Sequence, residues 1–536
     1  MPVVTLQVGQ CGNQLGQALW DALDAQCNAS TTTRSSDSDL KEASYFFKHD
    51  ADGQRKARCL LIDTEPKVVH AVLNHDAQGL FSRRRCFLGH SGRGNNWAYG
   101  YSQMFTGRTD GGKSHLKSQS AAAAGIPSAS GAALHSAPWN NSALVEEPGK
   151  EEFHILEQVV EGIRKECEEC DGAADFLMLH SLGGGSGSGL GSRLLEHLRE
   201  EYPLHNIATV SVAPRAAGDS PMQSLNSVLA LSFLQAYSDS VMLFNNQDMI
   251  EAAGRGDKTG TASLEDVNSH ISKAVMGALW PLNPREAHSG VSRIRDMVAT
   301  VSPDVCCKIV EARTSAVHTS DSLDYREACK SVQRQFSRFD KLDCDRPVTS
   351  SDSLLIARGL QAAPPPRFAQ ASASTNSSPS ACGTGQETVL ASTYIKACGG
   401  VSAFAGGGMY QTDVDCLDCV KVRTGPALKA VPASNSSSRK LNADSKRIAG
   451  GNPSGYSAAS SASVTVIANR SSVIGQLADT LDRATSIWRA GAYLHWYERC
   501  GCSKESIRTA IEQVSDVAEC YRSVHGIQDW LEAGDD

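Results

Sequence analysis

The sequence predicts an α/β fold built on a largely parallel sheet. Short apolar segments typical of buried strands occur at residues 3–8, 58–63, 176–181 and 207–212, and the first of them is β-branched. Segments with helical spacing separate them, as the crossover connections between parallel strands require. Two of the strands run directly into glycine-rich turns, at 9–12 and 183–189, which are typical of strand-to-helix junctions.

The expected helices follow these strands in order. Residues 13–23 place Leu15, Leu19 and Leu23 at four-residue spacing, and residues 190–199 follow the second glycine turn. Residues 264–280 are expected to form a long linking helix between the parallel sheet and a second, mixed α/β unit.

Two more helices are expected near the C-terminus, at residues 474–496 and from Ser503 onward. The second carries one apolar stripe, made of Ile507, Ile511, Val514, Val517, Tyr521 and Val524. Packing of both helices on the domain is favoured over the alternative, a surface that binds a partner.

Three regions are expected along the chain, with boundaries at 1–260, 261–470 and 471–536. Segments rich in Ser, Ala, Gly and Pro interrupt the first two, at 107–148 and at about 361–462. Such segments gain too little apolar burial to offset their ordering entropy, so we expect inserted loops. Short islands, such as residues 393–395 and 415–417, are the exceptions that we expect to fold.

Composition limits the classes of function. The 536 residues include 51 Lys+Arg and 59 Asp+Glu, for a net charge of −8, with 41% hydrophobic and 21% charged residues. This is typical of a globular protein, and the mild acidity argues against nucleic-acid binding. The sequence shows no signal peptide and no apolar stretch long enough to span a membrane, so we expect a cytoplasmic protein without a membrane partner.

The seventeen cysteines are expected to be free thiols in a reducing compartment. Two pairs, Cys167 with Cys170 and Cys416 with Cys419, have C-x-x-C spacing that is also used for zinc or redox chemistry. Metal binding is disfavoured, because the first pair lies in a Glu-rich helical segment and the second has no clear partner pair.

The sharpest chemical signal is the glycine-rich turn 183–189, which lies between an apolar strand and a helix. Glycine backbone amides can approach an anion closely, and the helix that follows favours negative charge at its start. A phosphate site is therefore favoured over a flexible linker. The turn lacks the Lys-Ser/Thr of a P-loop and the G-x-G-x-x-G spacing of a dinucleotide fold, so a cation and helix dipoles would have to neutralise the phosphates.

Other polar turns follow neighbouring strands and are expected to converge on the same ligand. They are the turn 9–14, the acidic turn 63–66 and the polar loop 92–97. Each alone is also compatible with an ordinary turn, and Asp63 and Glu65 are equally compatible with helix caps.

Together these motifs resemble the tubulin superfamily. Residues 9–14, 94–98 and 180–189 resemble its nucleotide loops in the right order, and residues 493–497 resemble the segment before its last helices. The resemblance covers about 1–106, 149–360 and 463–536. It implies a tubulin-like GTP-binding domain with a parallel sheet, a second mixed α/β domain and C-terminal helices.

The resemblance also implies a GTP/GDP site with Mg²⁺. Gln10 and Glu65 would lie near the Mg²⁺ and its waters, and Gly94 and Asn95 would face the γ-phosphate. The nucleotide-binding residues that it implies are Gln10, Cys11, Gln14, Asn95, Ser181, Gly184, Gly185, Ser186, Gly187, Gln223, Asn246, Leu264 and Asn268. Asn246 and Asn268 would read guanine, since an amide offers a donor and an acceptor together; either is also compatible with a helix cap.

Several positions depart from the family. Ser186 replaces the usual Thr, Gln223 replaces a ribose-binding Glu of α- and β-tubulins, and Leu264 replaces an aromatic ring that stacks on the base. In the helix that acts on a neighbouring subunit's nucleotide, Ala299 stands at the position aligned with the catalytic carboxylate, and Asp296 is a candidate substitute. We therefore expect weak or absent GTP hydrolysis.

Among subfamilies, the motifs 63–68, 94–101 and 354–359, and Gln223 followed by Asn226 and Ser227, look most like δ-tubulin. The last residues lack the Glu-rich tail of α- and β-tubulins. This implies a cytoskeletal protein of centrioles or basal bodies that supports triplet microtubules and cilia, with other tubulins, microtubules and centriolar proteins as partners. The alternatives are a self-assembling GTPase and a γ- or ε-tubulin-like nucleating or centriolar factor.

Overall fold

The computed structural model describes residues 1–28, 44–89, 91–102, 155–170, 172–215, 220–254, 262–282, 292–317, 325–341, 346–359, 385–404, 419–425, 428–429 and 460–527. The predicted insertion 107–148 and the predicted island 415–417 lie outside these residues. Nothing below concerns the structure of the remaining segments.

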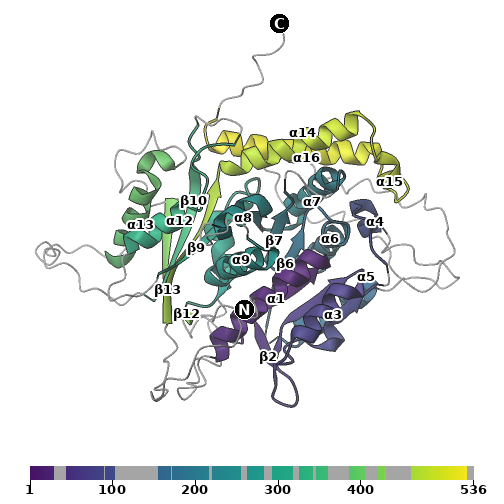
Figure 1. The fold of residues 1–536 in the computed structure, drawn as a ribbon, viewed down its shortest axis with the longest axis horizontal. Helices are drawn as coiled ribbons and strands as arrows, with labels where there is room; N and C mark the ends of the chain where they lie inside the picture. The colour runs from purple at the N-terminus through teal and green to yellow at the C-terminus, as the bar shows by residue number, and fades with distance from the viewer. Residues whose placement is uncertain are drawn as a thin grey trace, which may run out of the picture.

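A parallel sheet forms the first half of the molecule, as predicted (Figure 1). Its neighbours run in the order β8-β7-β6-β1-β4-β5, and each adjacent pair is parallel. The strands are β1 (Val3–Val8), β4 (Cys59–Asp63), β5 (Cys86–Leu88), β6 (Asp175–Ser181), β7 (Ile207–Ala213) and β8 (Ser240–Asn245). A short hairpin of β2 (Phe47–His49) and β3 (Arg55–Ala57) stands apart from this sheet.

The same sheet continues into a mostly antiparallel half. β9 (Ile309–Val317) pairs with β8 in parallel, and antiparallel pairing then joins β9 to β13 (Ser460–Arg470) and β13 to β10 (Ser350–Arg358). β11 (Val420–Gly425) pairs with β10 in parallel at the edge, and β12 (Leu428–Lys429) pairs with β13. The mixed character predicted for the second unit is therefore present.

Helices cover both faces of the parallel half, and each face has its own buried core. On one face lie α1 (Gly9–Asn28), α3 (Pro66–His75), α8 (Asn246–Gly254), α9 (Leu264–Leu279) and α11 (Arg293–Val301). The other carries α4 (Trp97–Ser102), α5 (Ile155–Glu168), α6 (Gly191–Glu201) and α7 (Gln223–Tyr237). The predicted linking helix is α9. It begins with a capping box formed by Ser263 and Asp266.

A third core lies on the antiparallel half, under α12 (Tyr325–Gln333) and α13 (Gly385–Cys398). α13 falls inside the segment 361–462 that was expected to be mostly loops. It extends the island predicted around 393–395 to a full helix, because Leu390, Tyr394 and Ile395 bury one apolar face against the sheet.

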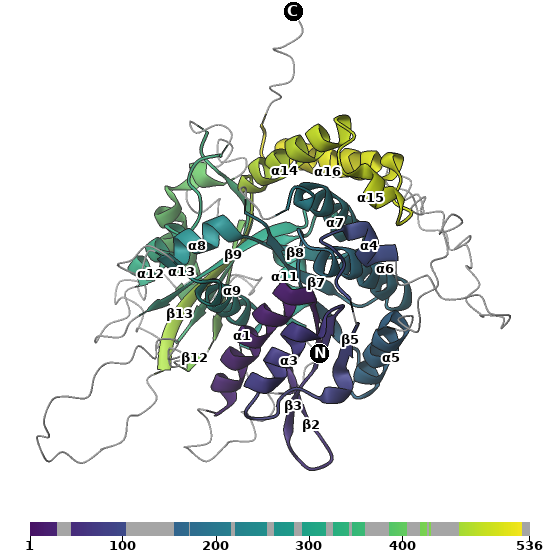
Figure 2. The ribbon, with the colours of Figure 1, turned by 45° about the vertical axis from the view of Figure 1, so that its right-hand side comes forward.

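The C-terminal helices form a layer over α7 (Figures 1 and 2). The prediction of a single helix over 474–496 is wrong. α14 (Ser472–Arg489) ends before Gly491, and a separate short helix, α15 (Leu494–Glu498), follows it. The break occurs at Gly491 (φ +65°) and Tyr493 (φ +63°), whose left-handed backbones cannot continue a helix.

The last helix, α16 (Lys504–Val524), starts at the predicted cap, where the Ser506 N–H donates to Ser503 Oγ at 3.1 Å. Most of its stripe packs inward, with Ile507, Val514, Val517 and Tyr521 buried, whereas Ile511 is partly exposed and Val524 is exposed. The Tyr521 hydroxyl donates to the Ile309 carbonyl at 2.7 Å, which ties α16 to the start of β9. Among the described helices, none is long and apolar enough to cross a membrane.

Candidate functional site

The carboxyl ends of β1, β4 and β6 bring the predicted polar turns to one edge of the sheet. β1 pairs with β4 on one side and β6 on the other, so the turns after these three strands are neighbours. In parallel α/β sheets ligands bind at this edge. Gln10, Cys11 and Gln14 lie in the first turns of α1, which begins directly after β1 at Gly9.

The turn 183–189 packs so tightly against its neighbours that glycine is required. A side chain on Gly9, which has φ +74°, would place Cβ 2.7 Å from the Gly187 nitrogen. A side chain on Gly185 would place Cβ 2.8 Å from Arg93 Cβ and 3.0 Å from the Asn96 nitrogen. The loops at 9–14 and 92–96 are therefore in backbone contact with the predicted phosphate turn, while Gly184 and Ser186 remain partly exposed.

The acidic turn after β4 contacts the same glycine turn. The Thr64 and Ser186 hydroxyls lie 2.6 Å apart. Burial raises the pKa of Asp63 to about 6, although the Thr64 N–H donates to its Oδ1 at 2.8 Å. Glu65 occupies the N-cap position of α3 but makes no capping hydrogen bond, and its exposed carboxylate lies beside Gly92.

A buried amide links the loops to the C-terminal layer. Asn226 on α7 donates from Nδ2 to the carbonyls of Asn95 (2.7 Å) and Gly183 (2.9 Å). Its Oδ1 accepts from the Trp97 N–H (2.9 Å) and from the Tyr497 hydroxyl of α15 (2.6 Å). One side chain therefore fixes the glycine turn, the loop that carries Asn95 and the C-terminal helices together.

A buried histidine, His180, contacts the glycine turn 183–189. His180 Nδ1 lies 3.0 Å from the Gly187 carbonyl and Nε2 lies 2.8 Å from Ser211 Oγ. The carbonyl can only accept, so Nδ1 carries the proton and Nε2 accepts from Ser211. Burial lowers the pKa of His180 to about 4, which keeps the ring neutral. Its neighbour Ser181, at the end of β6, faces the glycine turn.

The residues predicted to contact the base and the ribose are more exposed than the glycine turn and make fewer contacts within the protein. Leu264 is 63% exposed, and Asn246 and Asn268 are partly exposed with no side-chain hydrogen bond in the described part of the chain. Neither asparagine caps a helix, because Asn245 Oδ1 accepts the Gln247 N–H at 2.9 Å and Ser263 caps α9. Gln223 begins α7 and donates to the Arg215 carbonyl at 3.0 Å.

Comparison with known proteins agrees with this arrangement. Residues 2–120 and 147–254 match the GTPase domain of the Tubulin/FtsZ family, which includes the three strand ends and all the glycine turns described above. The matched residues are similar to this GTPase domain and make up less than half of the chain.

The chain is also similar to curated tubulins. It is 28% identical over 334 residues to the tubulin delta chain of Homo sapiens and 27% identical to that of Canis lupus familiaris, with 61% of this chain and 63% of each relative covered. The tubulin beta chain of Aspergillus fumigatus is 28% identical over 284 residues, covering 51% of this chain and 52% of that protein. The chain thus spans less than two thirds of the length of these relatives.

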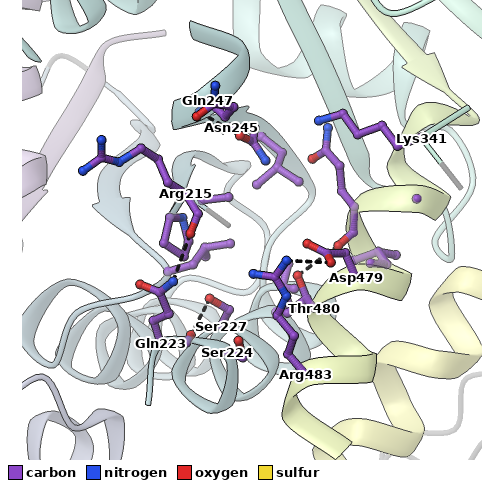
Figure 3. Close-up of a pocket in the computed structure, with 18 residues that line it drawn as sticks. Arg215, Gln223, Ser224, Ser227, Asn245, Gln247, Lys341, Asp479, Thr480 and Arg483 are labelled. Carbon is purple, nitrogen blue, oxygen red and sulfur yellow. Dashed lines mark hydrogen bonds and ion pairs between the residues drawn. The ribbon is translucent and has the colours of Figure 1, made fainter. Parts of the chain in front are cut away.

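A pocket of about 320 Å³ lies beside Gln223, one of the residues predicted to contact the nucleotide (Figure 3). Arg215 and Gln223 lie on one wall, and Lys341, Asp479 and Arg483 lie on the other. Gln223 is the predicted nucleotide residue that it includes, and the glycine turn 183–189 is not part of its wall. Two of its cations form ion pairs: Arg483 pairs with Asp479 at 2.9 Å, and Lys341 pairs with Asp248 at 2.8 Å.

The candidate catalytic residue Asp296 lies on α11, away from these turns and next to β11. Arg423 donates from Nη2 to Oδ1 at 2.9 Å, and Arg293 donates from Nη1 to Oδ2 at 2.9 Å. Both carboxylate oxygens are thus engaged within the chain. Ala299, on the same helix, is exposed and brings no acid or base.

The structure also reveals residues whose role was not predicted from the sequence. Asn226 and Arg93 stood inside quoted motifs without a role, and Tyr497 stood in a motif used only for recognition. No sequence signal separates such residues from ordinary polar ones, because their contacts join segments that lie far apart along the chain, such as Asn226 with Asn95 and with Tyr497. Of the first C-x-x-C pair, Cys167 lies at the end of α5 and Cys170 just beyond it. The Cys170 thiol donates to the Glu166 carbonyl at 3.3 Å, and among the described residues no group of three metal-ligating side chains is found.

Proposed function

We propose that this chain binds GTP or GDP with Mg²⁺ across the carboxyl ends of β1, β4 and β6. The observation that carries the proposal is the backbone contact between the loops 9–14, 92–96 and 183–189, which leaves amide-rich turns at one sheet edge. Converging backbone amides suit phosphate oxygens. The free amides of Asn246 and Asn268 suit the guanine edge, because nothing in the described protein competes for them.

Gln10 and Glu65 are the residues that would hold Mg²⁺ through water. Glu65 fits this role because its carboxylate is exposed, makes no capping bond and lies beside the loop that carries Asn95. Carboxylate and amide oxygens are ligands that Mg²⁺ prefers. The ion would supply the positive charge that the glycine turn 183–189 lacks.

The proposed role is that of a δ-tubulin-like cytoskeletal protein. The chain is similar to tubulin delta chains, and the motifs 63–68, 94–101 and 354–359 support the same subfamily. Its partners would be other tubulins, microtubules and centriolar proteins, at centrioles or basal bodies of the cytoplasmic cytoskeleton. There it would support assembly or maintenance of triplet microtubules and cilia.

Weak or absent GTP hydrolysis is part of the proposal. Acting on a neighbour's nucleotide requires a carboxylate that is free to orient water. Asp296 is held by Arg293 and Arg423, and Ala299 has no such group. The nucleotide would then act as an assembly and stability ligand through differential binding to two states.

The test is a titration of the purified protein with GTP, GDP and ATP, with phosphate release followed over a range of protein concentrations. Guanine-selective binding with slow release that does not depend on concentration supports the proposal. Release that rises with concentration and is lost in Asp296→Asn identifies the alternative, a self-assembling GTPase. Absence of binding removes the nucleotide role altogether.

The cellular role needs a separate test. A fluorescent fusion in a ciliated cell should localise to basal bodies, and its depletion should reduce triplets to simpler microtubules. Localisation to microtubule minus ends would instead identify a nucleating role of the γ-tubulin type.

A further inference from the structure

We propose that Arg93 is the protein's own cation for the terminal phosphate and makes the site prefer GTP over GDP. This inference rests on the proposed function, because it takes the glycine turn 183–189 as the phosphate cradle. It adds a charged residue to a site in which the glycine turn contributes none.

The first support is that Arg93 is buried without a counterion. Only 6% of the residue is exposed. Its Nη1 donates to the Ser91 carbonyl at 3.2 Å and to Ser91 Oγ at 3.1 Å, and the guanidinium lies 5.1 Å from the centre of the Tyr99 ring. In the described part of the chain, no carboxylate pairs with it, and Nε and Nη2 make no hydrogen bond.

Other buried arginines of this protein engage carboxylates or several carbonyls within the chain. Arg85 pairs with Glu166 at 2.9 Å, and Arg293 pairs with Asp296 at 2.9 Å. Arg313 and Arg358 donate instead to backbone carbonyls. Nε and Nη2 of Arg93 make no hydrogen bond in the described part of the chain, which leaves both donors available to an anion from outside the chain.

The second support is the place of Arg93 in the site. Its Cβ and carbonyl lie against Gly185, the middle of the glycine turn. Gly94 (φ +55°) and Asn95 (φ +52°) follow it in left-handed backbone, and the Asn96 N–H closes the turn on the Arg93 carbonyl at 2.9 Å. The backbone and Cβ of Arg93 are therefore held against the cradle, on the loop whose Gly94 and Asn95 are proposed to face the γ-phosphate.

The chemistry of the group fits this role. A guanidinium presents several N–H donors in a rigid fork that matches phosphate oxygens, and it stays charged at all relevant pH values. Since the loop of Arg93 meets the cradle at the γ-phosphate end, the contact would be made with GTP and would be absent with GDP. Arg93 is thus assigned as a specificity-determining residue.

The test compares Arg93→Gln, Arg93→Lys and the control Arg84→Gln, which removes one positive charge at an exposed position outside the site. Binding of GTP and GDP is measured by calorimetry, and thermal unfolding is followed with and without nucleotide. Arg93→Gln should lose about tenfold or more in GTP affinity and less than about threefold in GDP affinity. Arg93→Lys should recover part of the GTP affinity, and Arg84→Gln should match the wild type.

Unfolding gives a readout that a merely structural role would not produce. Removing an unpaired buried charge should leave the melting temperature of nucleotide-free Arg93→Gln equal to or above that of the wild type, while the added stabilisation by GTP shrinks. An unchanged GTP/GDP affinity ratio, or a lower melting temperature without nucleotide, would overturn the assignment of Arg93. A wild-type protein that binds no guanine nucleotide would overturn the proposed function itself.

Discussion

The two ends of the candidate site are built in different ways. At the phosphate end, the loops 9–14, 92–96 and 183–189 touch through backbone atoms, and the buried Asn226 fixes two of them. At the base end, Asn246, Leu264 and Asn268 are exposed or partly exposed, and their side chains make no hydrogen bond in the described residues. The proposed phosphate end is therefore preorganised by folding, whereas the amides at the proposed base end are left without a partner in the described residues.

Replacing Asn226 should disrupt the preorganised phosphate end and cause the largest loss of stability among the variants considered. Asn226→Ala leaves two carbonyls and one N–H without this partner in a buried position, which should cost about 4 kcal/mol of unfolding free energy. The Tyr497 hydroxyl keeps the Met222 carbonyl as an acceptor at 3.3 Å. Tyr497→Phe removes the bond of this hydroxyl to Asn226 and should cost about 1 kcal/mol. Urea denaturation and GDP binding measure the two effects.

Asn469 provides the matched control in the antiparallel half. It is equally buried, and its Nδ2 donates to the carbonyls of Val301 (3.1 Å) and Cys307 (2.7 Å). Asn469→Ala should therefore lose stability while the folded fraction keeps its nucleotide affinity. Equal losses of affinity in both variants would show that Asn226 has no special link to the site.

Low pH should lower the unfolding free energy of the protein through protonation of His180, which lies beneath the glycine turn 183–189. Its folded pKa of about 4 lies below the ordinary 6.5, so the unfolded chain binds the proton more readily. The stabilisation is complete above pH 6.5 and is lost as the pH falls toward 4, by up to roughly 3 kcal/mol. Unfolding free energies of wild type and His180→Gln between pH 4 and 8 should converge as the pH falls.

A second histidine must be separated from this effect. Burial also lowers the pKa of His525, which lies 2.8 Å from Thr349 Oγ1 in the C-terminal layer. The variant His525→Gln should remove its own share of the pH dependence and leave the share of His180. If His180→Gln retained the full slope, the histidine beneath the glycine turn would not be its source.

The phosphate end was also the easier end to predict from sequence. Its strands are short apolar segments and its turns are dense in glycine, so local signals sufficed to place both. The break between α14 and α15 was missed because helical spacing continues through Gly491 and Tyr493, and only their left-handed backbones end it. The role of Asn226 was missed because a polar residue on a helix becomes a hub only through tertiary contacts.

The contact between α1 and the glycine turn can be tested with two glycines of matched backbone. Gly9 (φ +74°) would place a Cβ 2.7 Å from the Gly187 nitrogen, whereas Gly53 (φ +76°) has nothing within 4 Å. In both Ala variants, the left-handed backbone should lower the unfolding free energy by about 1 kcal/mol. Gly9→Ala should lose about 2 kcal/mol more because of the clash with Gly187. Thermal unfolding of the two variants would measure the excess, and equal melting temperatures would contradict the contact.

The smallest effect on stability is expected at the base end. Asn246→Ala and Asn268→Ala remove side chains without partners in the described protein, so the unfolding free energy should change by less than about 0.5 kcal/mol. The affinity for GTP should nevertheless fall by about tenfold or more, with the preference over ATP reduced, because the guanine edge would lose its hydrogen bonds. Asn245→Ala should show the reverse pattern, since it removes the bond to the Gln247 N–H, which should cost about 1 kcal/mol of stability, and spares the proposed guanine contact. Stability losses in the Asn246 and Asn268 variants as large as that of Asn245→Ala would mean that the base end, too, is held by contacts within the protein.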